Sequence, residues 1–203
     1  MLPYFGLVDV RRMLPSDWAG QVEAVSDTAA RWAVLRGGTS TSLEDVDTVI
    51  NYRLLTGDDI AEHLPWLIDL YQKQFLEIAQ QFSGCDLVVD ESITSAVNIN
   101  ILPPDERGYE WHVDSNPVTG VLFLSSHVHD EGGCLELRTA DDHLLSIEPL
   151  AGTFAVFDAR RCPHRVSTPK EGLRISAPMN YFVPEEGRQR PADLDNALYG
   201  TSR

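Results

Sequence analysis

The pattern of apolar positions divides the chain into two parts with different periods. In the first part, apolar residues recur every three to four positions over two stretches, which predicts helices at about 18–34 and 58–82. Between them, a looser alternation predicts a strand at about 46–55, and Pro65 predicts that the second helix bends or begins later. We therefore expect residues 1–93 to form a helical region that supports the rest of the fold.

In the second part, the apolar runs are short and are separated by Gly, Pro, Asn and Asp every ~8–12 residues, which is typical of a β-sandwich or barrel. There are eight such runs, the number that a two-sheet jelly roll needs. We expect a mainly β core over 94–183, a tail over 184–203, and one domain over the whole chain, with its helices packed on one sheet. The expected strands are 94–102, 109–114, 118–125, 133–139, 143–148, 152–158, 163–168 and 173–183.

Composition agrees with a soluble globular protein and limits its partners. The chain has 203 residues, of which 43% are hydrophobic, enough for one domain with a sizeable core. Lys and Arg number 16 against 31 Asp and Glu, so the formal net charge is -15. Such a surface repels nucleic acid phosphates and anionic membranes, and we expect neither nucleic acid nor a membrane as a partner.

The cysteines and the N-terminus indicate a cytoplasmic protein. Cys85, Cys134 and Cys162 are odd in number and widely spaced, which predicts reduced thiols and no disulfide framework or zinc site. The first residues lack the apolar run and basic flank of a signal peptide. No stretch approaches 18 uninterrupted apolar residues, so we expect no membrane span.

The most informative motif is His112-Val113-Asp114. On a strand, side chains two positions apart point to the same face, so His112 and Asp114 form two sides of a candidate metal site. His164 follows fifty positions after Asp114, on a strand that a jelly roll brings back near the first. Two histidines and one carboxylate, with the remaining positions open, suit a non-haem Fe(II) centre. We expect these three residues to be the metal ligands and the catalytic centre.

A second motif, Arg174-Ile175-Ser176, begins ten positions after His164 on the following strand. Arg174 and Ser176 share one face, and an arginine presents a planar fork that matches a carboxylate. A metal site with an arginine about one strand further on suits a dicarboxylate cosubstrate that chelates the metal at one end. We expect Arg174 and Ser176 to bind the other end.

Together these motifs resemble the Fe(II)/2-oxoglutarate-dependent oxygenase superfamily. The resemblance covers roughly residues 94–183 and implies a double-stranded β-helix, the jelly roll of that superfamily. Many prolyl hydroxylases carry Lys where this chain has Arg174, so the Arg-x-Ser pattern is more general than that branch. The features similar to the prolyl-hydroxylase-like branch are the stretch 108–115, the pair Gly132-Gly133 before an apolar-acidic strand, and the stretch 152–157 before His164.

The resemblance implies an oxidoreductase, a dioxygenase that uses Fe(II), 2-oxoglutarate and O2. Iron would be held by His112, Asp114 and His164, and 2-oxoglutarate would chelate it while Arg174 and Ser176 hold the far carboxylate. A substrate C–H bond would be oxidised with release of succinate and CO2. In such enzymes the metal and cosubstrate supply the chemistry and the protein supplies the geometry.

Other residues are candidates for binding the cosubstrate. Asn98 and Asn100 alternate with Val97, Ile99 and Ile101, so both face away from the apolar side of their strand and either can reach 2-oxoglutarate. The alternative is an inward polar pair that the backbone satisfies. Thr119 is a candidate for the same pocket, or else a buried Thr without a role in binding.

For the substrate, Glu110 shares the face of His112 and could bind a cationic group, or lie at the rim. Arg160 and Arg161 precede His164 and could bind a substrate carboxylate, or face water. A short chain leaves little beyond the core fold, so we expect a small-molecule substrate, an amino acid or a secondary metabolite, that is hydroxylated. The alternative is a protein side chain, as for prolyl hydroxylases.

Two further classes of protein stay open at this point. His127-x-His129 followed by Glu131 is faintly similar to a cupin motif, which would make the chain a metalloenzyme that does not use 2-oxoglutarate. Ser, Asp and Gly around this pair predict instead a solvated loop. A jelly-roll binding module without catalysis is the other class, and the complete set of candidate ligands argues against it.

Overall fold

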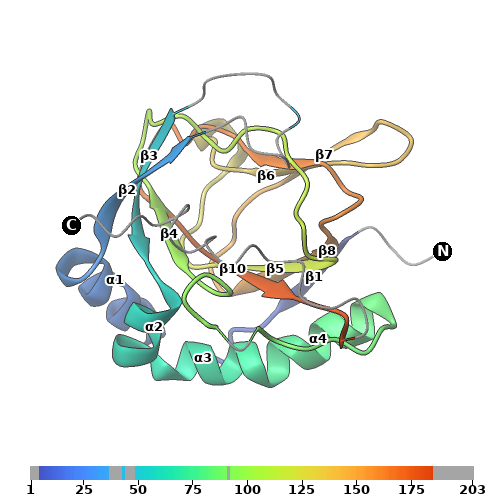
Figure 1. Ribbon diagram of the computed structural model, residues 1–203. Helices are drawn as coiled ribbons and strands as arrows, with labels where there is room; N and C mark the ends of the chain where they lie inside the picture. The colour runs from blue at the N-terminus through green and yellow to red at the C-terminus, as the bar shows by residue number, and fades with distance from the viewer. Residues whose placement is uncertain (1–4, 37–42, 44–48, 91, 185–203) are drawn as a thin grey trace.

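The computed structural model describes residues 5–36, 43, 49–90 and 92–184, and the chain folds into two facing β-sheets with helices on one side (Figure 1). The larger sheet has the order β1 (Phe5–Asp9), β8 (Thr153–Asp158), β5 (Val118–Phe123), β10 (Arg174–Tyr181), β4 (Ile99–Leu102), β3 (Val49–Leu55), β2 (Arg31–Arg36). The smaller sheet has the order β7 (Leu144–Ile147), β6 (Leu135–Arg138), β9 (His164–Val166). The expected tail beyond residue 184 lies outside the described residues.

The jelly-roll prediction is confirmed. Both sheets are built from antiparallel pairs, and their inner faces enclose an apolar layer. This architecture is the double-stranded β-helix. The layer contains Val121, Phe123, Ala155 and Phe157 from the larger sheet and Leu135, Leu137 and Ile147 from the smaller one.

One expected strand, 109–114, is not a regular strand. Only His112 pairs in it, through a single bridge to His164 of β9. The N–H of Asp114 then donates to the carbonyl of Ala159 (2.9 Å), which turns the segment away from β9 after that one pair. The segment still occupies the fourth place of the smaller sheet, beside β9.

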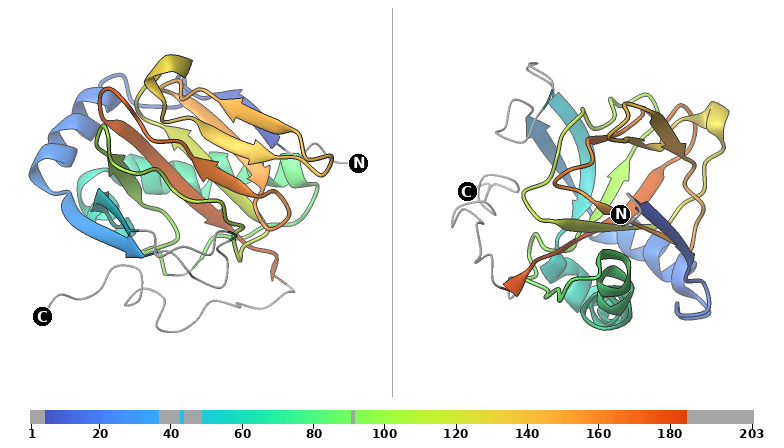
Figure 2. Two further views of the ribbon diagram at one scale, coloured as in Figure 1. Left: turned by 90° about the horizontal axis from the view of Figure 1, so that it is seen from above. Right: turned by 90° about the vertical axis from the view of Figure 1, so that its right-hand side faces the viewer.

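The helices lie against the outer face of the larger sheet (Figures 1 and 2). On β10, Ala177, Met179 and Tyr181 belong to the core cluster on the helical side, and the alternate Arg174 and Ser176 face the inside of the jelly roll. The helices therefore support the face behind the site. They are α1 (Trp18–Thr28), α2 (Gly57–His63), α3 (Pro65–Gln72) and α4 (Gln74–Ser83), and η1 (His129–Glu131) is a short 3-10 turn.

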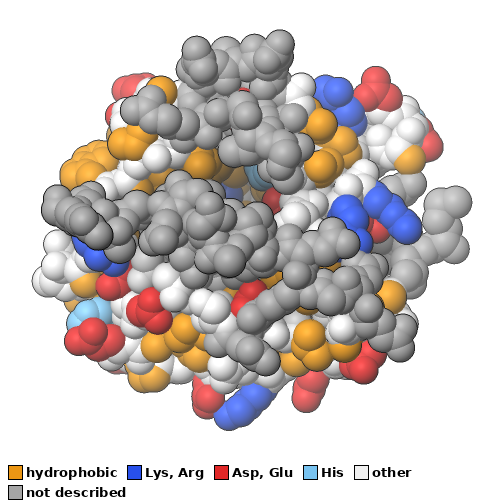
Figure 3. All heavy atoms as spheres, viewed as in Figure 1, with side chains coloured by type: hydrophobic (Ala, Val, Ile, Leu, Met, Phe, Trp, Pro, Cys, Tyr) orange, Lys and Arg blue, Asp and Glu red, His pale blue; other side chains and the backbone are white. Residues whose placement is uncertain are grey.

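The helix expected at 18–34 is correct only for its first part, because 31–36 forms the strand β2. Trp32 and Val34 lie on the outer side of this edge strand and are 64% and 50% exposed. Hydrophobic side chains accordingly gather at the upper left of Figure 3, over the β2–β3 hairpin. Residues 31–36 form a strand because they pair with β3, and the local sequence pattern does not reveal this pairing.

The helix expected at 58–82 is three helices. Pro65 begins α3 and not a bend, since proline is tolerated in the first turn of a helix. A second break falls at Lys73, whose backbone is not helical, and Gly84 then ends α4 in the left-handed conformation. Residues 1–93 hold the strands β1, β2 and β3 besides these helices, and β3 is the strand expected at about 46–55. Within the described part of the chain, no helix has the length and hydrophobicity that crossing a bilayer requires.

Gly120→Ala is expected to lower the free energy of unfolding by about 1–3 kcal/mol. A Cβ at Gly120 on β5 would lie 2.1 Å from Cζ of Phe154, which is stacked on Phe75 of α4 with ring centroids 4.5 Å apart. The methyl group would push this pair, and α4 with it, away from the sheet. The control is Gly20→Ala in α1, where nothing lies within 4 Å and the change should be neutral or stabilising. Chemical denaturation of both variants tests this, and equal midpoints would contradict it.

Candidate functional site

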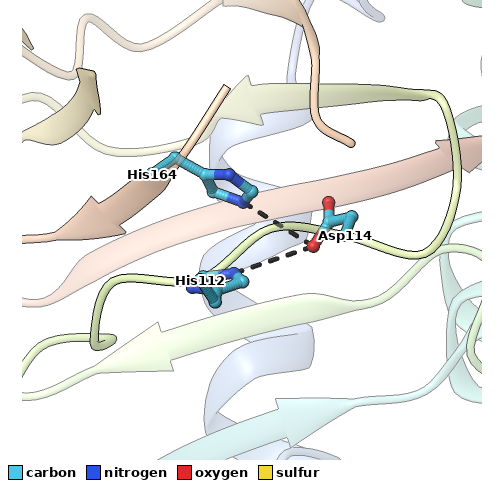
Figure 4. A group of neighbouring side chains, drawn as sticks. All are labelled: His112, Asp114 and His164. Atoms are coloured by element: carbon cyan, nitrogen blue, oxygen red, sulfur yellow. Dashed lines mark ion pairs between the residues drawn. The ribbon is translucent and has the colours of Figure 1, made fainter. Parts of the chain in front are cut away.

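His112, Asp114 and His164 converge on one point between the two sheets (Figure 4). One ligand atom from each lies within 4.8 Å of the others, and each imidazole Nε2 is 3.7 Å from Oδ1 of Asp114. The bridge to β9 places the two histidines opposite each other, and the turn after His112 brings Asp114 to one side of both. Among the described residues, no other group of His, Cys, Asp and Glu has this geometry.

Both imidazole rings are oriented by backbone carbonyls. Nδ1 of His112 lies 2.7 Å from the carbonyl oxygen of Glu110, and Nδ1 of His164 lies 3.0 Å from that of Cys162. A carbonyl can only accept, so each Nδ1 carries a proton and each Nε2 is the nitrogen that faces the centre. Burial lowers the pKa of His164 to about 4, which keeps this ring neutral at physiological pH, as a metal ligand must be.

The carboxylate of Asp114 is held by a pair of buried side chains. The Thr119 hydroxyl donates to Oδ2 of Asp114 (2.6 Å), and the Asn116 amide donates to the Thr119 hydroxyl (2.8 Å). Thr119 was expected at the cosubstrate pocket, and the structure places its hydroxyl on the metal-ligand candidate. Sequence reasoning missed Asn116, because Asn-Pro before a strand is an ordinary turn signal.

Trp111 fixes the same segment from its other face. Its ring makes cation–π contacts with the guanidinium groups of Arg138 and Arg165, which lie 4.7 and 4.8 Å from the ring centroid. Trp111 precedes His112, and Arg165 follows His164. The cation–π contacts therefore tie the segment that carries His112 to β9, which carries His164, and to β6.

Arg174 is a buried cation without an anionic partner among the described residues. Its side chain donates through Nε to the carbonyl of Gly133 and through Nη1 to the hydroxyl of Ser176, both at 2.7 Å. Only 2% of Arg174 is exposed, and burial lowers its pKa to about 10, so it remains charged at neutral pH. An uncompensated buried charge is costly, and a bound carboxylate would compensate it.

The two asparagines lie opposite β10, Asn100 near this arginine and Asn98 further along, at Pro178. Asn100 pairs with Ser176 across β4 and β10, so its side chain is on the inner face, and its Oδ1 is buried without a hydrogen-bond partner. Asn98 is also buried, at 8% exposure. The inner face thus offers Asn100, Ser176 and Arg174 in one row, in an apolar surrounding that includes Leu102 and Phe123.

The residues expected to bind substrate lie at different distances from the centre. Glu110 supplies the carbonyl that orients His112, and its own side chain is partly buried. Arg160 donates from Nε and Nη2 to the carbonyl of Ser115, next to Asp114, at 3.2 and 3.0 Å. Arg161 extends into solvent, with 81% of its side chain exposed and a long contact to Asp158 (3.8 Å). The structure therefore brings Arg160, and not Arg161, to the ligand segment.

His127 is not part of a solvated loop, contrary to expectation. It is 5% exposed, its N–H donates to Pro149, and its Nε2 lies 3.2 Å from the carbonyl of Leu173. The ring is covered by Gly133 and Gly172, which come from other parts of the chain. His127 does not join the metal-ligand candidates.

The site's donor set fits a ferrous ion with a dicarboxylate cosubstrate. Two Nε2 atoms and one carboxylate oxygen face a common point and leave the rest of a coordination sphere open. The buried, unpaired Arg174 supplies the positive charge that a second carboxylate requires.

Comparison with known proteins agrees with this chemistry. Residues 97–182 match the family model of the 2OG-Fe(II) oxygenase superfamily. No curated protein sequence is significantly similar to the chain.

Several solved structures share the fold. The complex of a prolyl hydroxylase with a peptide fragment of the hypoxia inducible factor oxygen degradation domain, from Trichoplax adhaerens, is 17% identical, with a TM-score of 0.66 over 90% of this chain and 85% of that one. AviO1 from Streptomyces viridochromogenes Tue57 is 16% identical, with a TM-score of 0.63 over 94% and 93%. SnoN, a non-haem α-ketoglutarate-dependent epimerase from nogalamycin biosynthesis, is 10% identical, with a TM-score of 0.61 over 89% and 78%.

Proposed function

We propose that the chain, whose residues 97–182 match the 2OG-Fe(II) oxygenase superfamily, is a member of that superfamily and hydroxylates a small molecule, an amino acid or a secondary metabolite. As a member, it is an oxidoreductase that uses Fe(II), 2-oxoglutarate and O2 and releases succinate and CO2. The observation that carries the assignment of the site is the combination of the His112, Asp114 and His164 cluster with the unpaired Arg174 on the same inner surface.

Each group has a proposed role. His112, Asp114 and His164 would hold Fe(II), and Arg174 with Ser176 would bind the distal carboxylate of 2-oxoglutarate, beside Asn100. When bound, iron and cosubstrate together supply the activation of oxygen. The chain orients the ligands, neutralises the carboxylate and excludes water by its apolar lining.

Packing around the site supports a small substrate. The inner face of the β2–β3 hairpin packs against Tyr109, just before the ligand segment, and against Val166 of β9. Ile50 and Tyr52 of β3 are 1% and 4% exposed in this cluster. Side chains of the chain itself therefore fill this flank, where an extended peptide would need an open groove.

The chain is also proposed to work as one domain in the cytoplasm. A single core cluster contains residues of α2, α3 and α4 together with residues of β4, β5, β8 and β10, which joins residues 1–93 to the jelly roll. Cys85, Cys134 and Cys162 are all free, which supports a reducing compartment.

A substrate screen tests the proposal. The protein with Fe(II), 2-oxoglutarate and O2 is offered amino acids, small secondary metabolites and proline-containing peptides, and succinate and the oxidised product are quantified by mass spectrometry. We expect one small molecule to give succinate and product in a ratio near one, because only a correctly placed C–H bond couples the two. If a peptide or folded protein gives coupled product while every small molecule gives uncoupled succinate, the substrate class is wrong.

A further inference from the structure

Asp114 offers its two carboxylate oxygens to different partners. Oδ1 faces Nε2 of both His112 and His164 at 3.7 Å, and Oδ2 is turned away from them (Figure 4). Oδ2 accepts the short hydrogen bond, 2.6 Å, from the Thr119 hydroxyl. Oδ1 therefore faces the proposed metal position, and Oδ2 is held by a hydrogen bond from the protein.

The direction of this hydrogen-bond chain is determined by its far end. The Asn116 amide nitrogen lies 2.8 Å from the carbonyl oxygen of Val118, which can only accept, so the amide orientation is assigned without ambiguity. The second amide proton of Asn116 points to the Thr119 oxygen, also at 2.8 Å. The single proton of the Thr119 hydroxyl is then left for Asp114, in a charge-assisted bond.

The chain of bonds anchors a loop residue to the sheet. Thr119 belongs to β5 and pairs with Phe157 and Asn180 in the middle of the larger sheet, whereas Asp114 lies on an irregular segment. Thr119 and Asn116 are 4% and 5% exposed, so water does not compete for these bonds. Rotation of the Asp114 carboxylate would break the bond to Thr119 and leave the buried Thr119 hydroxyl without its acceptor, which is costly.

We propose that Asn116 and Thr119 are positioning residues that keep Asp114 a one-oxygen ligand of the metal. This inference rests on the proposed metal site. A carboxylate free to rotate can offer both oxygens and occupy a coordination position that cosubstrate or oxygen needs. Thr119 accordingly acts through Asp114 and does not contact 2-oxoglutarate.

The test compares three variants of the full chain loaded with Co(II), whose absorption spectrum reports coordination number. Thr119→Val keeps the shape of the side chain and removes the hydroxyl, and Thr119→Ser keeps the hydroxyl. Thr153→Val makes the same change on β8 of the same sheet, outside the site. We expect Thr119→Val to bind Co(II) about 10–100-fold more weakly, with an altered spectrum and a reduced response to 2-oxoglutarate. Thr119→Ser and Thr153→Val should resemble the wild type.

Each outcome has a distinct meaning. If Thr119→Val binds Co(II) with the affinity and spectrum of the wild type, the positioning role is wrong. If the only change is a rise in the apparent constant for 2-oxoglutarate, Thr119 is a cosubstrate contact instead. Failure of the wild type itself to bind Co(II) would overturn the proposed metal site, and this inference with it. If circular dichroism shows that Thr119→Val does not fold, Thr119→Ser decides the question alone. Because it keeps the hydroxyl, weaker Co(II) binding with an altered spectrum in this variant would contradict the proposal.

Discussion

His164→Ala is expected to abolish iron binding and succinate formation together. His164 is buried, neutral and oriented by the Cys162 carbonyl, so its ring can bind a metal ion without first rearranging. Loss of an outer partner of a ligand already costs about 10–100-fold in affinity, and loss of the ligand itself should exceed that. Iron content by elemental analysis and succinate release measure the two effects on the same sample.

The matched control for this variant is His143→Ala. The His143 side chain is 77% exposed and lies in the turn between β6 and β7, away from the ligands. It should retain one iron per chain and full turnover. Because the His164 ring also packs edge-on against Phe157, with centroids 4.8 Å apart, thermal unfolding of the metal-free proteins should accompany the comparison. Full iron content and activity in a folded His164→Ala protein would show that the ligands are others.

The grouping of the ligand candidates could be predicted from the sequence, although part of the reasoning did not hold. Strand periodicity places His112 and Asp114 on one face, but the structure has only one bridged pair there and no regular strand. The residues still meet, because His112 pairs with His164 and the Asp114 N–H turns to Ala159. The sequence spacing of these residues therefore predicted the metal-ligand candidates that the structure brings together, although the secondary structure predicted for 109–114 was wrong.

The features that sequence reasoning missed depend on contacts between distant parts of the chain. His127 stands among Ser, Asp and Gly, a local pattern of solvation, yet it is covered by Gly172 and Leu173. Strand β2 has apolar residues that face solvent at a sheet edge, so its pattern does not report its burial. The sequence around Asn116 predicts only a turn, and its link to Asp114 through the Thr119 hydroxyl is visible only in the structure. Local periodicity carries no information on such partners.

The unpaired charge of Arg174 predicts opposite effects on stability and on binding. Without cosubstrate, the guanidinium is buried with two neutral hydrogen-bond acceptors and no carboxylate, an arrangement that stabilises the fold little. Arg174→Met replaces it by an uncharged side chain of similar length. Replacing a buried charge by a well-packed apolar group is often neutral or stabilising, so the free protein should unfold at the same temperature as the wild type or higher.

Binding of 2-oxoglutarate by Arg174→Met should be nearly lost, because the distal carboxylate would enter an apolar pocket unpaired. Removing one partner of a buried charge pair costs about 2–5 kcal/mol, which corresponds to a roughly 30- to 4,000-fold rise in the apparent constant for 2-oxoglutarate. The wild type should gain thermal stability as 2-oxoglutarate is added with metal, and the variant should gain none at the same concentrations. Arg161→Ala, at an exposed arginine, is the control and should respond like the wild type. An unchanged constant in Arg174→Met would assign the carboxylate to another cation, for which Arg160 beside the ligand segment is a candidate.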